Sequence, residues 1–130
     1  MFALKGYQQR AMETLASFLS EAKQSGNVGQ AYADSLEAQQ LPSVAYRDFQ
    51  FGDVPYVCIR IPTGGGKTVL ASHSIVTAGS HYLEVEFPVV LWLVPSTTIR
   101  LQTVEALKKS GHPYREKLDQ AFNHQVIVLD

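Results

Sequence analysis

Three consecutive glycines followed by a lysine and a threonine are the residues of this chain best placed to do chemistry. Glycines at 64–66 let the backbone take positive φ and approach a ligand without a Cβ in the way. The N–H groups of such a loop, with the N-terminus of a following helix, form a site for phosphate oxygens. Lys67 would reach the terminal phosphates of a nucleoside triphosphate, and the Thr68 hydroxyl would bind Mg²⁺. The stretch therefore predicts a phosphate-binding loop over residues 62–68.

The residues on either side of this loop agree with that prediction. Residues 56–61 form an apolar run that stops at Pro62 and predicts a strand, and residues 67–83 predict a helix. Strand, tight loop and helix are the order of a P-loop. The usual pattern G-x-x-x-x-G-K-[ST] begins with glycine where this chain has Ile61, so the match is to a variant. The alternative is a glycine-rich turn that precedes Lys-Thr by chance.

Length, composition, net charge and cysteine content limit what kind of protein this chain can be. The chain has 130 residues, which is one domain or part of one, with 45% hydrophobic and 18% charged residues. A net charge of −1 gives no global basic field that would indicate a nucleic-acid partner. Cys58 is the only cysteine, and we expect a buried, inert thiol in a reducing compartment. Without a signal peptide or a membrane span, we expect a cytoplasmic protein with no membrane partner.

Hydrophobic periodicity predicts further helices and strands along the chain. Helical spacing predicts helices over 4–24 and 97–109, and weaker patterns predict helices over 30–40 and from Pro113 onward. Two more apolar runs, Pro88–Val94 and 125–129, predict strands. The first of these runs lacks alternation, so we expect it to be buried on both faces, with Trp92 in the core.

Residues 26–54 carry no recognisable chemistry and are interpreted as an insertion before the first core strand. Within them, residues 43–54 predict a loop, with an edge strand over 46–51 as the alternative. The remaining strands alternate with helices, which predicts βαβ units and an α/β fold with a parallel sheet. Right-handed crossovers would place the glycine loop at the carboxyl ends of the strands, where ligands bind in such sheets.

Three stretches, in this order, resemble the start of a superfamily 2 helicase or translocase core. LKGYQQRAM is similar to the L-x-x-Y-Q element, PTGGGKT to the P-loop, and LWLVPSTTIRLQT to motif Ia. RIPTGGGKT together with VPSTTIRLQT most resembles the Res subunit of type III restriction–modification systems and its DEAD/DEAH-like relatives. The resemblance implies a partial RecA-like P-loop NTPase domain with a parallel sheet flanked by helices. Residues 1–130 would be the N-terminal part of this ATP-binding domain.

The resemblance also implies a set of ATP-binding residues. In the family the glutamine of the first element recognises adenine, and an amide can donate to and accept from the base edge at once. A solvated helix glutamine is the alternative for this position. The cofactors implied are ATP and Mg²⁺, with Lys67 and Thr68 in catalysis and Thr68 at the metal. The predicted nucleotide-binding residues are Gln8, Pro62, Thr63, Gly64, Gly65, Gly66, Lys67 and Thr68.

The motif Ia-like stretch implies contacts with a nucleic-acid backbone. Hydroxyl and N–H groups at a helix start are good phosphate ligands and position the strand without reading bases. Ser96, Thr97 and Arg100 are the candidates, and simple helix capping by Ser96 is the alternative. The segment 100–117 has five basic and two acidic residues, which gives weak support. The implied partners are DNA and a modification (methyltransferase) subunit.

The acidic motif that ATP hydrolysis needs in this family is missing. No Asp-Glu pair occurs in the sequence. The ending VIVLD suggests Asp130 as a Walker B aspartate, but in the family another strand normally lies between motif Ia and the acidic motif, and this run fits that place better. We therefore expect the N-terminal fragment of a longer DNA helicase or translocase that does not hydrolyse ATP alone. The rival hypotheses are a P-loop kinase or other NTPase without nucleic acid, and a non-catalytic nucleotide-binding module.

Overall fold

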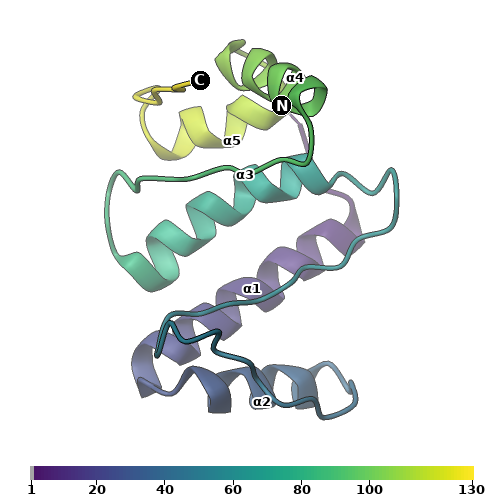
Figure 1. Cartoon of the computed structure of the whole chain (residues 1–130), viewed down its shortest axis with the longest axis vertical. Helices are drawn as coiled ribbons and strands as arrows, with labels where there is room; N and C mark the ends of the chain where they lie inside the picture. Colours follow the sequence, from purple (N-terminus) through teal and green to yellow (C-terminus); the bar gives the residue numbers. More distant parts are fainter. Residues whose placement is uncertain (1) are drawn as a thin grey trace.

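The chain folds as a set of packed helices with long extended segments along one side (Figure 1). The computed structural model describes residues 2–130. Its elements are α1 (Gly6–Ser25), α2 (Val28–Ala38), α3 (Lys67–Ala78), the π-helical turn η1 (Gly79–Leu83), α4 (Thr97–Lys108) and α5 (Pro113–Ala121). Every predicted helical segment is confirmed, with ends that differ by a few residues. No helix in this described part of the chain combines the length and apolar character that a membrane span requires.

The apolar core is built around α1, whose apolar residues recur at helical spacing. Phe18 lies edge-on to Tyr32 of α2, with ring centroids 6.3 Å apart. Full burial of a large apolar side chain contributes about 1.5–3 kcal/mol, so this cluster fixes α1 between α2 and α3. The buried residues of the cluster are Met12, Leu15, Phe18, Leu19, Ala22, Val28, Ala31 and Leu70.

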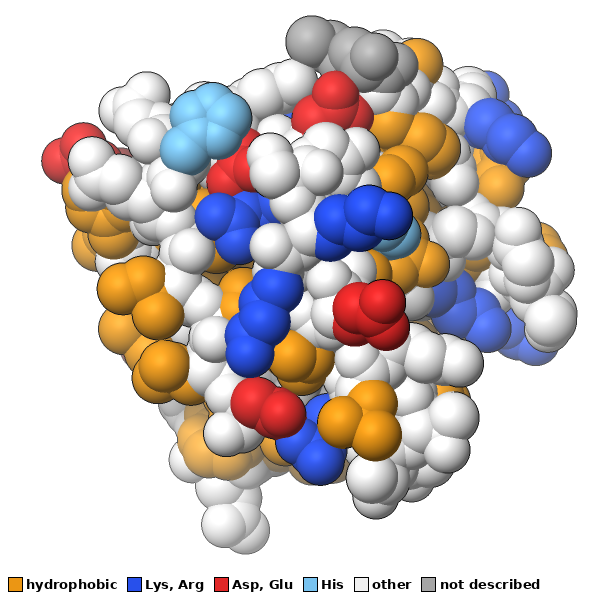
Figure 2. All heavy atoms as spheres, turned by 90° about the horizontal axis from the view of Figure 1, so that it is seen from above, with side chains coloured by type: hydrophobic (Ala, Val, Ile, Leu, Met, Phe, Trp, Pro, Cys, Tyr) orange, Lys and Arg blue, Asp and Glu red, His pale blue; other side chains and the backbone are white. Residues whose placement is uncertain are grey.

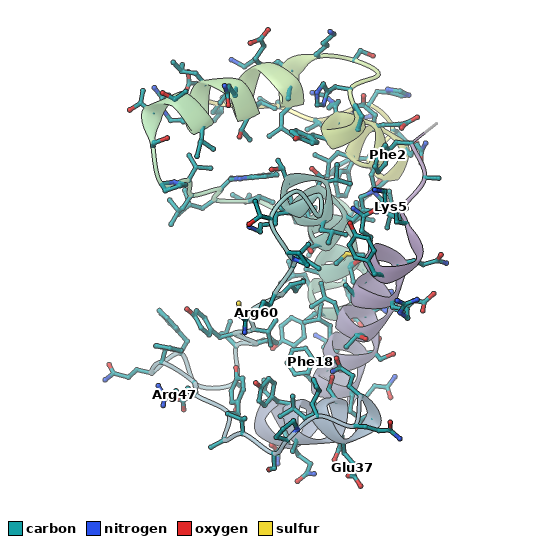
Figure 3. All side chains as sticks on the ribbon, turned by 90° about the vertical axis from the view of Figure 1, so that its right-hand side faces the viewer. Phe2, Lys5, Phe18, Glu37, Arg47 and Arg60 are labelled. Atoms are coloured by element: carbon teal, nitrogen blue, oxygen red, sulfur yellow. The ribbon has the colours of Figure 1, made fainter. Side chains whose placement is uncertain are left out.

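The predicted parallel sheet is wrong, because no strand is formed anywhere in residues 2–130. The runs 56–61, 88–94 and 125–129 are non-helical, and no backbone hydrogen bond joins one to another. Figures 1 and 3 show the first two passing along the same side of α1 and α3. Apolar, β-branched residues favour extended backbone, but a ladder needs a neighbouring strand about 4.8 Å away in register. The edge strand considered over 46–51 is absent for the same reason.

The run 88–94 illustrates the correction, because the structure covers only one side of it. Its odd-numbered apolar residues are largely exposed, while Trp92, predicted to lie in the core, is half-buried. The exposed fractions are 101% for Val89, 82% for Leu91 and 80% for Leu93. Cys58, predicted to be buried, is also exposed. Both errors follow from the same assumption, that a sheet would cover these residues on both faces.

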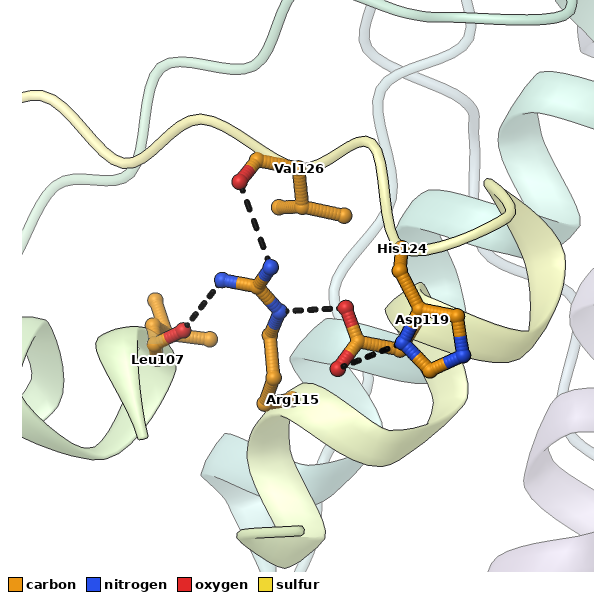
Figure 4. A network of polar contacts seen from close by, with 5 residues as sticks. All are labelled: Leu107, Arg115, Asp119, His124 and Val126. Carbon is orange, nitrogen blue, oxygen red and sulfur yellow. Dashed lines mark hydrogen bonds and ion pairs between the residues drawn. The ribbon is translucent and has the colours of Figure 1, made fainter. Parts of the chain in front are cut away.

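The C-terminal extended segment is positioned by a side-chain network instead of a ladder (Figure 4). The Arg115 guanidinium donates to the Asp119 carboxylate at 2.5 Å, to the Leu107 carbonyl at 2.9 Å and to the Val126 carbonyl at 3.3 Å. His124 lies 3.6 Å from the same carboxylate. One α5 side chain therefore joins the end of α4 to the chain that follows α5.

The contact between α3 and α5 contains a histidine. Burial lowers the pKa of His73, and the Lys117 ammonium of α5 lowers it further. A neutral imidazole is therefore favoured in this contact near neutral pH.

Candidate phosphate-binding site

The predicted phosphate-binding loop connects an extended segment to a helix. Residues 56–61 run along α1, and α3 begins at Lys67 (Figure 1). The Gly65 N–H donates to the Pro62 carbonyl at 2.9 Å, which closes a four-residue turn. Gly64 occupies the third position of this turn with φ of 75°, as a type II turn requires. The loop therefore turns the chain sharply into the first turn of α3.

The N-terminus of α3 has no side-chain cap. Gly66 precedes it with φ of 85°. The first N–H groups of a helix lack partners within it and attract anions. Lys67 is exposed and Thr68 is half-buried, and within residues 2–130 no hydrogen bond or ion pair engages the Lys67 ammonium. A cation and a helix N-terminus thus meet at one place, as a phosphate site needs.

The first turn of α1 contacts the glycine loop directly. Gln8 is only 3% exposed, and its Nε2 donates to the Gly65 carbonyl at 2.7 Å. Its Oε1 accepts the Lys5 N–H at 2.8 Å. The Tyr7 hydroxyl donates to the same Gly65 carbonyl at 2.9 Å. The structure therefore places Gln8 against the loop, as a buried side chain and not a solvated one, while its recognition of adenine stays a prediction.

The contact of Tyr7 with the loop was not predicted. The signal was its place directly before Gln8 in the L-x-x-Y-Q element. A tyrosine at such a position carries a hydroxyl that can reach a backbone carbonyl when its ring packs. The contact joins residues 58 positions apart, so only the fold reveals it.

Two of the cavities in the part of the chain that the structure describes are lined mostly by helical residues. One, of about 560 Å³, is a groove between α1 and α2 that is lined by Arg10, Glu13 and Asp34 among others. The other, of about 150 Å³, lies around His73 and Lys117. Neither of these cavities is lined by a residue of the glycine loop.

The candidates for nucleic-acid contact lie at the start of α4. Ser96 is its N-cap, with a side-chain oxygen that accepts the Ile99 N–H at 3.3 Å, so the capping alternative is realised. Thr97 is the first residue of the helix and is exposed. Arg100 pairs with Asp130, the residue considered as a Walker B aspartate. Contacts of Ser96, Thr97 and Arg100 with a nucleic-acid backbone stay a prediction.

The charge distribution around α4 and α5 gives no strong indication of a nucleic-acid surface. Figure 2 views this end of the molecule and shows basic and acidic side chains interspersed. A continuous basic stripe is the usual electrostatic footprint of nucleic-acid binding. The visible face carries no such stripe, so DNA contacts there would depend on individual side chains and backbone amides.

Gly65 is predicted to tolerate no side chain, for a steric reason. A Cβ on Gly65 would lie 2.3 Å from Ile61 Cγ2 and 2.8 Å from the Pro62 carbonyl oxygen, so the loop would have to open. We expect Gly65→Ala to lower the free energy of unfolding by about 1–3 kcal/mol. The measurement is chemical denaturation followed by circular dichroism.

Gly29→Ala is the matched control for this substitution. A Cβ there would meet nothing closer than Asn27 Oδ1 at 3.7 Å, and Gly29 lies inside α2. Because Gly29 is the second residue of this helix, alanine should be accepted there with a change in unfolding free energy within about 0.5 kcal/mol. An equal and small effect of both substitutions would mean that the loop is not packed as described.

Comparisons with known proteins yield one match. The family model described as "Type III restriction enzyme, res subunit" matches residues 1–127. No curated protein matches the chain, and no solved structure matches it. The matched range contains α1, the glycine loop and the start of α4, which carry all the candidate site residues.

Proposed function

Because this chain belongs to the family of type III restriction enzyme res subunits, we propose that it is the ATP-binding portion of an ATP-dependent DNA helicase or translocase. The family has a helicase-like, ATP-dependent role. Type III restriction Res subunits act on DNA and pair with a modification subunit. We extend each of these properties to this chain as part of the proposal, with ATP and Mg²⁺ as cofactors.

The observation that supports the proposal best is the loop at 62–68. Its turn enters α3 with an uncapped N-terminus, and the Lys67 ammonium beside it has no partner within residues 2–130. Phosphoryl transfer relies on positioning and charge neutralisation more than on covalent chemistry. In the proposed role, loop amides and Lys67 hold the phosphates, and Thr68 holds Mg²⁺. Gln8 reads the base, and α4 meets the DNA backbone through Ser96, Thr97 or Arg100.

The test is isothermal titration of the chain with ATP, with and without Mg²⁺ and with and without DNA. We expect weak, Mg²⁺-dependent binding and no turnover, since the sequence has no Asp-Glu pair to activate water. We also expect single- or double-stranded DNA to change the ATP affinity by about 5-fold or more, the usual size of coupling between two sites.

The titration also separates the rival hypotheses, because each of them predicts a different response to Mg²⁺ and to DNA. Mg²⁺-dependent heat without any effect of DNA would favour a kinase-like NTPase. No Mg²⁺-dependent heat at all would favour a non-catalytic module. Steady hydrolysis by the purified chain that is lost in Lys67→Ala would contradict the expectation that residues 1–130 lack a complete catalytic site.

A further inference from the structure

Two side-chain donors from α1 converge on one carbonyl of the glycine loop. The Tyr7 hydroxyl and Gln8 Nε2 lie 2.9 Å and 2.7 Å from the Gly65 oxygen. Gly65 itself is buried, and a Cβ on Gly66 would lie 2.4 Å from Gln8 Nε2, so the amide packs closely against the loop. The carbonyl oxygen has two lone pairs, so one donor can occupy each.

Holding this carbonyl determines where the next N–H points. All peptide bonds in the described chain are trans. In a trans peptide the C=O and the following N–H point in opposite directions. Since the Gly65 carbonyl is turned toward α1, the Gly66 N–H is turned away from α1. That N–H has no backbone acceptor in residues 2–130, and it directly precedes the open N-terminus of α3.

Without these bonds the peptide between Gly65 and Gly66 would be free to rotate as a unit. Gly66 has φ of 85°, in the region that glycine enters about as easily as negative φ. A rotated peptide would direct a carbonyl, not an N–H, at an anionic ligand. The two donors on α1 therefore select the orientation that suits phosphate.

We propose that Tyr7 is a positioning residue for nucleotide binding, which keeps the Gly66 N–H directed at the phosphates by holding the Gly65 carbonyl. The ligand is the nucleotide of the proposed function, on which this role rests. Gln8 shares the task, but its amide is also expected to meet the base, and Oε1 is already bonded to Lys5. The Tyr7 hydroxyl has only this one partner in the described chain, so it holds the carbonyl when Gln8 engages adenine.

Tyr7→Phe removes the hydroxyl and keeps the ring. Loss of one neutral hydrogen bond should weaken Mg²⁺–ATP binding by about 3- to 10-fold. Because the effect passes through the phosphate loop, GTP binding should weaken by the same factor. The structural readout is NMR of the isotope-labelled full chain without nucleotide. We expect the Gly65 carbonyl carbon and the Gly66 amide to shift or broaden in the variant.

Tyr82→Phe is the matched control, since its hydroxyl also donates to a single backbone carbonyl, that of Asp53, at 3.0 Å. It should leave both the Gly66 amide signal and the ATP affinity unchanged. Unchanged Gly65 and Gly66 signals in Tyr7→Phe would overturn the proposal, and so would shifted signals with unchanged affinity. If the unsubstituted chain binds no ATP, the proposed function fails, whereas the NMR response still decides whether Tyr7 orients this peptide.

Discussion

Replacing Lys67 with alanine should weaken Mg²⁺–ATP binding by about 10- to 100-fold, since a hydrogen bond to a charged group contributes about 1.5–3 kcal/mol. Lys67 is exposed, at the first position of α3, and within residues 2–130 nothing neutralises its ammonium. A triphosphate bound at the loop would therefore be its first strong partner. The measurement is isothermal titration of both proteins with ATP and Mg²⁺.

The same substitution should leave folding nearly unchanged. An exposed lysine without a partner contributes little to stability, so the unfolding free energy should stay within about 0.5 kcal/mol. Lys109→Ala is the control, because Lys109 is an exposed lysine at the C-cap of α4 and belongs to neither the loop nor α3. Equal weakening by both substitutions would show a general charge effect. Unchanged binding in Lys67→Ala would remove the main support for a phosphate site.

The helices were predictable because their signals are local. Apolar residues at helical spacing, Ser96 at the N-cap of α4 and Pro113 at the first turn of α5 each act within a few residues of their own position. The glycine loop was predictable for the same reason. Its turn depends on Gly64, and its helix start depends on Gly66. Local rules therefore located both the candidate site and the helix that follows it.

The strands and the α1 contacts were not predictable in the same way, because both depend on distant partners. The composition of 88–94 favours extended backbone, but nothing in that run specifies which segment would pair with it. No segment within residues 2–130 pairs with this run, and its Leu91 is therefore left exposed. The bond from Tyr7 to Gly65 likewise requires α1 to pack beside the loop, and the apolar cluster that contains Met12 of α1 and Leu70 of α3 supports that packing.

Replacing Asp119 with alanine should lower the free energy of unfolding by about 3 kcal/mol, the lower part of the range for breaking a buried ion pair. Asp119 is 5% exposed, and its carboxylate accepts the Arg115 Nε–H at 2.5 Å. Without it, a largely buried guanidinium retains only the carbonyls of Leu107 and Val126. Chemical denaturation followed by circular dichroism measures the loss.

Asp34→Ala is the control for this effect. Asp34 also bonds a side chain one helical turn away, the Gln30 amide at 2.7 Å, but it does so on the exposed face of α2. Water replaces such a bond, so the cost should be within about 0.5 kcal/mol. A loss below about 1 kcal/mol for Asp119→Ala would mean that water reaches Arg115. The C-terminal segment would then have to be held by contacts other than this network, since it has no ladder to hold it.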